Sequence, residues 1–160
     1  MSGPAAGARA RLWLAAAALL SLAAVGAAVY TQQAWDMLPC PWCVLQRLIF
    51  VAIAAACVLG LLWPAGGAAL ALVLAGGGIA AALWQHFVAA SAASCDLTLA
   101  DRIMAATGLD GRYPDVFMAM ASCADAKVDL FGLPYEFWSL GLFVVLAAMA
   151  ALALRRTRRR

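Results

Sequence analysis

The residues of this sequence that can carry chemistry are its five cysteines. Cys40 and Cys43 form a Cys-Pro-Trp-Cys motif, Cys95 and Cys123 follow later in the chain, and Cys57 lies within a long apolar stretch. Two thiols at this spacing can close a short, reducible disulfide ring, and four cysteines permit two bridges in an oxidising compartment. We interpret Cys57 as a small buried hydrophobe. The other four predict thiol–disulfide exchange.

The Cys-Pro-Trp-Cys motif stands where a polar segment meets an apolar one. Pro39 and Pro41 fix the backbone before a helix begins. Free N–H groups at a helix N-terminus favour a thiolate over a thiol, so the sequence predicts a lowered cysteine pKa here. Arg47 follows Cys43 by four residues and shares its helix face. It can stabilise negative charge on the thiolate and on a bound electron acceptor, or extend its charge to the lipid headgroups.

Two other interpretations of the cysteines stay open. A zinc site would need to recruit Cys95 and Cys123, since the sequence has neither a second CxxC nor an HxxxH motif, and we expect no metal. A purely structural disulfide is the stronger alternative, because the spacing of the cysteines shows neither which other sulfurs a thiol can reach nor its pKa.

The elements that must position these cysteines are membrane helices. Of the 160 residues, 67% are hydrophobic and 12% are charged, which favours lipid as the solvent. A helix needs about 20 apolar residues to cross a bilayer. Four stretches of about that length lie near residues 12–30, 44–62, 68–90 and 134–154. The sequence therefore predicts an all-α membrane protein, a single domain over residues 1–160 that forms a four-helix transmembrane bundle.

The distribution of basic residues orients this bundle. Seven of the eleven Lys and Arg residues flank the first and last apolar stretches, at the two ends of the chain. The positive-inside rule then places both termini in the cytoplasm and the segments 31–43 and 91–133 outside. A cleavable signal peptide is the alternative for the first stretch. We expect a lipid bilayer, and no nucleic acid, as a partner.

The long outer segment, residues 91–133, is bracketed by Cys95 and Cys123. Its glycines and Pro114 predict turns, and its apolar residues recur at helical spacing. We expect short amphipathic helices that lie on the bilayer surface, or that pack on the top of the bundle. A bridge between the two cysteines would tie the ends of this segment together.

These features together resemble a known family. The chain combines four spans, a Cys-Pro-Trp-Cys motif with Arg47 behind it, and a second cysteine pair in a long outer loop. The stretches Cys123-Ala124-Asp125 and Asp129-Leu130-Phe131-Gly132-Leu133-Pro134, followed by Trp138 and Leu140-Gly141, continue the likeness. The chain resembles the bacterial disulfide bond formation protein B (DsbB) family, and the resemblance extends over nearly its whole length.

The resemblance implies a thiol oxidase in the bacterial inner membrane with its cysteines in the periplasm. A reduced DsbA-like dithiol oxidase attacks Cys95, Cys123 passes the reducing equivalents to Cys40, and Cys43 meets a membrane quinone, either ubiquinone or menaquinone, with Arg47 beside it. We predict resting Cys40–Cys43 and Cys95–Cys123 bridges, and a Cys40–Cys123 bridge during turnover.

Two further positions relate to the family pattern. Family members often have a histidine close to the quinone, and His86 lies near the end of the third span, although a histidine there is also suited to a headgroup contact. Gln46 stands where some members have an acidic residue. Two other functions remain possible from the sequence: a four-helix quinone or epoxide reductase that moves electrons the opposite way, and a non-enzymatic membrane subunit stabilised by disulfides.

Overall fold

Four long helices form the body of the protein in a computed structural model, which describes residues 4–89 and 98–158. The helices are α1 (Pro4–Trp35), α2 (Pro41–Leu59), α3 (Pro64–Phe87) and α7 (Tyr135–Arg158). Each contains a segment long and apolar enough to cross a membrane. The predicted four-helix membrane fold is confirmed, and α1 extends further than expected, to Trp35.

Prolines define where two of the helices begin. Pro41 and Pro64 lie in the first turns of α2 and α3, where a missing N–H costs nothing and the fixed φ suits a helix. The apolar stretches 44–62 and 68–90 leave residues 63–67 as the predicted turn between the second and third spans, and this position is wrong. The chain turns at residues 60–63 and α3 begins at Pro64, whose fixed φ suits the first turn of a helix.

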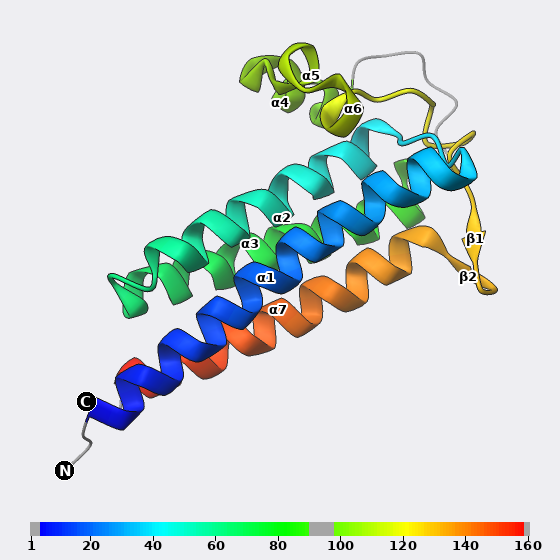
Figure 1. Cartoon of the computed structure of the whole chain (residues 1–160). Coiled ribbons are helices and arrows are strands. Elements are labelled where there is room, and N and C mark those ends of the chain that lie inside the picture. Colours follow the sequence, from blue (N-terminus) through cyan, green and yellow to red (C-terminus); the bar gives the residue numbers. More distant parts are fainter. Residues whose placement is uncertain (1–3, 90–97, 159–160) are drawn as a thin grey trace.

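The four helices pack as an antiparallel bundle in which α1 and α3 each lie against α2 and α7 (Figure 1). Small residues allow close approach: a side chain on Gly67 would collide with the backbone of Gly60. At the centre, Phe143 stacks on Phe50 with ring centroids 4.1 Å apart. The Phe143 ring also covers Gly78, so that α2, α3 and α7 meet around one aromatic pair.

The connection between α3 and α7 crosses the end of the bundle opposite the two termini (Figure 1). Its described part contains three short helices, α4 (Leu99–Thr107), α5 (Leu109–Arg112) and α6 (Pro114–Phe117). A capping box of Thr98 and Asp101 begins α4, and Gly108 ends it with φ 63°. The predicted short helices are present, and α4 and α6 pack against α2. Their contact with lipid stays a prediction.

A two-stranded hairpin returns the chain to the bundle. Strand β1 (Asp129–Leu130) pairs with β2 (Leu133–Pro134), and both turn residues, Phe131 and Gly132, have positive φ. The Trp138 indole on α7 donates a hydrogen bond to the Leu130 carbonyl, 3.2 Å away. The hairpin thereby fixes the segment that follows Cys123 against the first turn of α7.

Candidate active site

Cys40 is the N-cap residue of α2. Its backbone is extended, with φ −84° and ψ 167°, and its sulfur accepts a hydrogen bond from the Cys43 backbone N–H at 3.2 Å. This places the Cys40 sulfur over the first turn of the helix, in a fully buried position. The predicted location of the motif, at the start of the second span, is confirmed.

Cys123 reaches the same helix end from the long connection. The backbone N–H groups of Met120 and Ala121 donate to the Pro39 carbonyl, at 2.9 and 3.3 Å, which holds the segment before Cys123 against the motif. The Cys123 sulfur is hydrogen-bonded to the Cys40 thiol and to the Trp42 backbone N–H. Two otherwise unpaired N–H groups of the first turn of α2 therefore point at two different cysteine sulfurs.

The contacts among these thiols shift their acidity in opposite directions. The hydrogen bond from Cys40 lowers the pKa of the Cys123 thiol, because it stabilises the thiolate, and the Trp42 N–H acts in the same direction. The pKa of Cys40 is raised, first by its hydrogen bond to Cys123, then by the one to Cys43 and by burial. The expected lowered pKa is therefore wrong for Cys40, since the neighbouring thiols outweigh the helix N-terminus.

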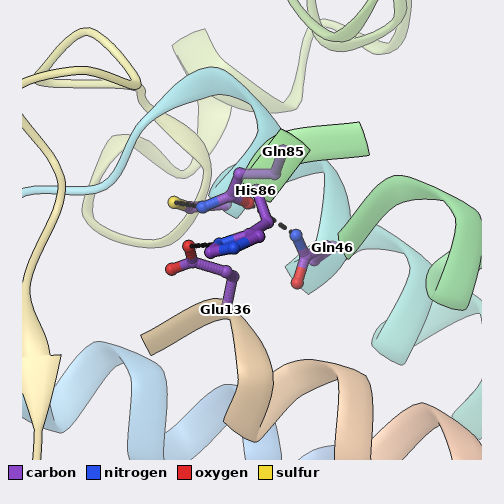
Figure 2. A network of polar contacts seen from close by, with 5 residues as sticks. Gln46, Gln85, His86 and Glu136 are labelled. Atoms are coloured by element: carbon purple, nitrogen blue, oxygen red, sulfur yellow. Dashed lines mark hydrogen bonds and ion pairs between the residues drawn. The ribbon is translucent and has the colours of Figure 1, made fainter. Parts of the chain in front are cut away.

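Cys43 lies one turn inside α2 and faces a different environment. Its sulfur accepts a hydrogen bond from the Gln85 side-chain amide on α3, 3.3 Å away. Gln85 in turn accepts one from Gln46 at 2.6 Å, so the predicted candidate position Gln46 belongs to this network (Figure 2). The Cys40 thiol is hydrogen-bonded to both Cys43 and Cys123. Cys40 is thus the central sulfur of three.

Arg47 is buried rather than extended toward the headgroups, with 5% of its surface exposed. Its guanidinium donates hydrogen bonds to the Gln32 side-chain oxygen at 2.7 Å, the Val116 carbonyl at 2.9 Å and the Ala28 carbonyl at 3.2 Å. These oxygens belong to α1 and α6, and all are neutral. Within the described part of the chain, no carboxylate forms an ion pair with Arg47, so its positive charge is uncompensated by a salt bridge.

A cavity of about 210 Å³ lies beside Cys43 and Arg47, bounded mainly by α1, α2 and α7. Its polar lining includes the hydroxyl-bearing Thr31 and Tyr135, which are hydrogen-bonded to each other at 3.2 Å. Alanines of α1, Phe50 and other apolar side chains form the rest of the wall. The cavity combines a reactive sulfur, a cation and a hydroxyl with an apolar wall.

The remaining cysteines occupy other places. Cys57 is fully buried in the core of the bundle, which confirms its interpretation as a small hydrophobe. Cys95 lies outside the described residues. Cys40, Cys43, Cys57 and Cys123 carry free thiols in the structure, so the predicted resting pairing stays a prediction.

Comparison with known proteins identifies the family. The family model described as "Disulfide bond formation protein DsbB" matches residues 10–153. The chain belongs to the DsbB family. A disulfide bond formation protein B from Dechloromonas aromatica is 31% identical over 153 residues, covering 89% of this chain and 90% of that protein. One from Herminiimonas arsenicoxydans is 33% identical, with 84% and 88% covered.

A third DsbB relative, disulfide bond formation protein B 1 of Pseudomonas syringae, is 29% identical and covers 95% of this chain and 94% of its own length. Membership in the DsbB family, together with four apolar helices, makes this chain a multi-pass bacterial membrane protein with an oxidoreductase-type role in disulfide bond formation.

Several polar residues around the DsbB site were not singled out from the sequence. They are Gln32, Gln85, Tyr135 and Glu136. The Nδ1 of His86, which the family pattern relates to the quinone, lies 2.8 Å from a Glu136 carboxylate oxygen, and this contact joins the end of α3 to the start of α7. Polar amides within or beside apolar stretches are costly in lipid, and that cost is the signal that could have found Gln32 and Gln85.

Proposed function

We propose that this DsbB-family protein is a quinone-dependent thiol oxidase that reoxidises a DsbA-like periplasmic dithiol oxidase. The observation that carries the proposal is the position of the Cys40 sulfur, in hydrogen-bonding contact with both Cys43 and Cys123. Thiol–disulfide exchange requires a thiolate to reach one sulfur of a disulfide. A central sulfur with a neighbour on each side can exchange one bridge for the other with little movement.

The exchange balances as a relay. The reduced partner attacks the Cys95–Cys123 bridge at Cys95, and Cys123 leaves as a thiolate. The Cys123 thiolate attacks Cys40, so that a Cys123–Cys40 bond forms while the Cys40–Cys43 bond breaks and Cys43 leaves as a thiolate. The partner's second thiol releases Cys95, and Cys95 then displaces Cys40 from Cys123. Cys40 and Cys43 are left reduced, and their bridge re-forms by loss of two electrons and two protons.

The cavity beside Cys43 suits the acceptor of those electrons. A quinone bound there supplies a site for two electrons and two protons. The cavity is smaller than the roughly 300–1,000 Å³ of drug-sized ligand sites. Its size therefore suits the quinone ring alone, with the isoprenoid tail of the quinone in the lipid. Arg47 places a positive charge and Tyr135 a hydroxyl in its lining. A larger apolar cavity of about 670 Å³ between α2 and α3 has no cysteine among its described lining residues and suits the reaction less.

The same proposal includes the orientation in the membrane. The thiols lie at the end of the bundle that carries α4 to α6, and both termini lie at the opposite end (Figure 1). The arginines concentrate at the terminal end, which the positive-inside rule assigns to the cytoplasm. We therefore place the thiols on the periplasmic face of the bacterial inner membrane, where a soluble DsbA-like partner can reach them.

The test is reoxidation of a reduced DsbA-like protein by the purified chain with added ubiquinone or menaquinone, followed by quinone absorbance. We expect one quinone consumed per partner dithiol, and no consumption by Cys43→Ser. Arg47→Ala should raise the apparent KM for quinone about 10–100-fold, since removing a buried charged hydrogen-bonding group costs roughly 1.5–3 kcal/mol.

Two results would overturn the proposal. Wild-type protein that keeps its disulfides while consuming no quinone would favour a structural role for the cysteines. Protein that oxidises a quinol and reduces the partner's disulfide under the same conditions would favour a reductase that moves electrons the opposite way.

A further inference from the structure

Two buried glutamine side chains from different helices form a chain of hydrogen bonds that ends on the Cys43 sulfur (Figure 2). Gln46 on α2 and Gln85 on α3 are 3% and 6% exposed. The Gln46 amide nitrogen donates to the Gln85 oxygen at 2.6 Å, and the Gln85 amide nitrogen donates to the sulfur at 3.3 Å. Both helices cross the apolar part of the bundle, where an unpaired amide is costly.

The last bond of this chain is unusual in its acceptor. A neutral thiol is a weak acceptor, whereas a thiolate accepts a charge-assisted hydrogen bond that is roughly twice as strong as a neutral one. An amide buried for packing alone would gain more from a backbone carbonyl. An N–H aimed at a sulfur stabilises that sulfur most when it carries a negative charge.

We propose that Gln85 is a catalytic residue that donates a hydrogen bond to the Cys43 thiolate, and that Gln46 is a positioning residue that fixes the direction of the Gln85 amide. The inference rests on the proposed function, because Cys43 leaves as a thiolate when the Cys40–Cys43 bridge opens. The Gln85 N–H therefore donates to the sulfur atom on which the negative charge forms.

The other donors near Cys43 are already engaged. The Arg47 guanidinium donates to three oxygens of α1 and α6, and the Cys43 backbone N–H donates to Cys40. Among the described residues, the side chains that donate a hydrogen bond to the Cys43 sulfur are Gln85 and the Cys40 thiol, and Cys40 is itself the partner in the disulfide exchange. The two polar groups thereby have separate roles: Gln85 stabilises the sulfur, and Arg47 adds positive charge to the cavity beside it.

The direction of the Gln85 amide depends on Gln46. Because Gln46 donates to the Gln85 oxygen, Gln85 must present its NH2 group to the sulfur. Gln46→Glu replaces this donor by a carboxylate that accepts hydrogen bonds. The Gln85 amide should then turn over, donate to the carboxylate and present its oxygen to Cys43. A change of one functional group that does not touch the sulfur would thus remove the donor from it.

The test measures the reactivity of Cys43 in the full-length chain with the other four cysteines replaced by alanine, in detergent or nanodiscs. The rate of alkylation by iodoacetamide is followed from pH 6 to pH 10 by mass spectrometry. Gln85→Leu and Gln46→Glu are compared with the parent. Gln33→Leu is the matched control, because Gln33 is exposed on α1 and is not among the residues that line the cavity beside Cys43. Circular dichroism and thermal unfolding verify that each variant is folded.

We expect Gln85→Leu and Gln46→Glu to lower the alkylation rate at pH 7 about tenfold and to move the midpoint of the pH profile about one unit higher, which corresponds to about 1.4 kcal/mol. Gln33→Leu should change neither. In the quinone assay with all cysteines present, Gln85→Leu should lower kcat and leave the KM for quinone within about twofold of wild type.

A folded Gln85→Leu variant with an unchanged pH profile would overturn the inference, and so would a Gln46→Glu variant that matches the parent. The alkylation assay contains neither quinone nor partner. Its outcome therefore stands apart from the proposed function, which would fail on the absence of quinone consumption by the wild type instead.

Discussion

Arg47 should hold α6 against the bundle as well as contribute charge to the cavity. Its guanidinium binds the Val116 carbonyl of α6 directly, at 2.9 Å. It also donates to Gln32, whose amide nitrogen lies 3.4 Å from the Asp115 carbonyl in the same short helix. Arg47→Met keeps most of the side-chain volume and removes all the guanidinium N–H donors. Arg47 then loses both its direct bond to the Val116 carbonyl and its link through Gln32 to Asp115.

The expected magnitude follows from those contacts. A hydrogen bond to a charged group contributes roughly 1.5–3 kcal/mol, and every 1.4 kcal/mol is tenfold in an equilibrium constant. Loss of the Val116 contact alone should therefore raise the local opening of residues 114–118 about 10–100-fold. Phe117 stays buried against Val44 and Met104, so the rest of the connection should remain in place.

Amide hydrogen exchange with mass spectrometry measures this opening. Peptides that contain residues 114–118 should exchange about 10–100-fold faster in Arg47→Met, while peptides from α4 should be unchanged. In Arg47→Lys, residues 114–118 should exchange at a rate between those of the wild type and Arg47→Met, because one ammonium group cannot reach all three oxygens. Arg112→Met, on the exposed surface of α5, is the matched control. Unchanged exchange of residues 114–118 in a folded Arg47→Met variant would refute this role of Arg47.

Three further predictions concern other parts of the molecule. In the fully reduced protein, the initial alkylation rate of Cys123 should have a pH midpoint below that of an ordinary thiol, and that of Cys40 a midpoint above it. The hydrogen bond between the two thiols lowers the pKa of Cys123 and raises the pKa of Cys40, so equal midpoints would contradict this. Gly78→Ala should cost about 1–3 kcal/mol in thermal unfolding because the new methyl meets the Phe143 ring, whereas Gly77→Ala, with open space around it, should cost nothing. Glu136→Ala should lower the Tm more than Glu136→Gln, because the glutamine keeps a neutral hydrogen bond to His86. An equal fall in Tm for both variants would show that this hydrogen bond contributes little to stability.

The sequence predicts the helices well because their signals are local. Four apolar stretches of sufficient length determine four spans, and Pro41 marks the start of the second span together with its thiol motif. The helical spacing of apolar residues likewise predicts α4 and α6. The turn is predicted too late in the chain because Pro64, Gly66 and Gly67 suggest a loop, although Gly67 serves close helix packing instead.

The site itself depends on contacts between distant segments, which local signals do not contain. The meeting of Cys40 with Cys123 is fixed by backbone hydrogen bonds to the Pro39 carbonyl, and no residue type encodes those bonds. The reversed acidity of Cys40 follows from that meeting. Gln85 was overlooked because an uncharged amide lowers the hydropathy of a span only slightly, and its partner Gln46 lies 39 residues away in the chain.

The most direct test of the relay is to map the disulfides formed when the oxidised protein meets a reduced DsbA-like partner without quinone. Acid quenching, alkylation and peptide mass spectrometry identify each bridge. The position of the Cys40 sulfur between Cys43 and Cys123 predicts that a Cys40–Cys123 bridge accumulates together with a free Cys43 thiol, and that added quinone removes both. An intact Cys40–Cys43 bridge throughout, while the partner becomes oxidised, would contradict the proposed route of electrons.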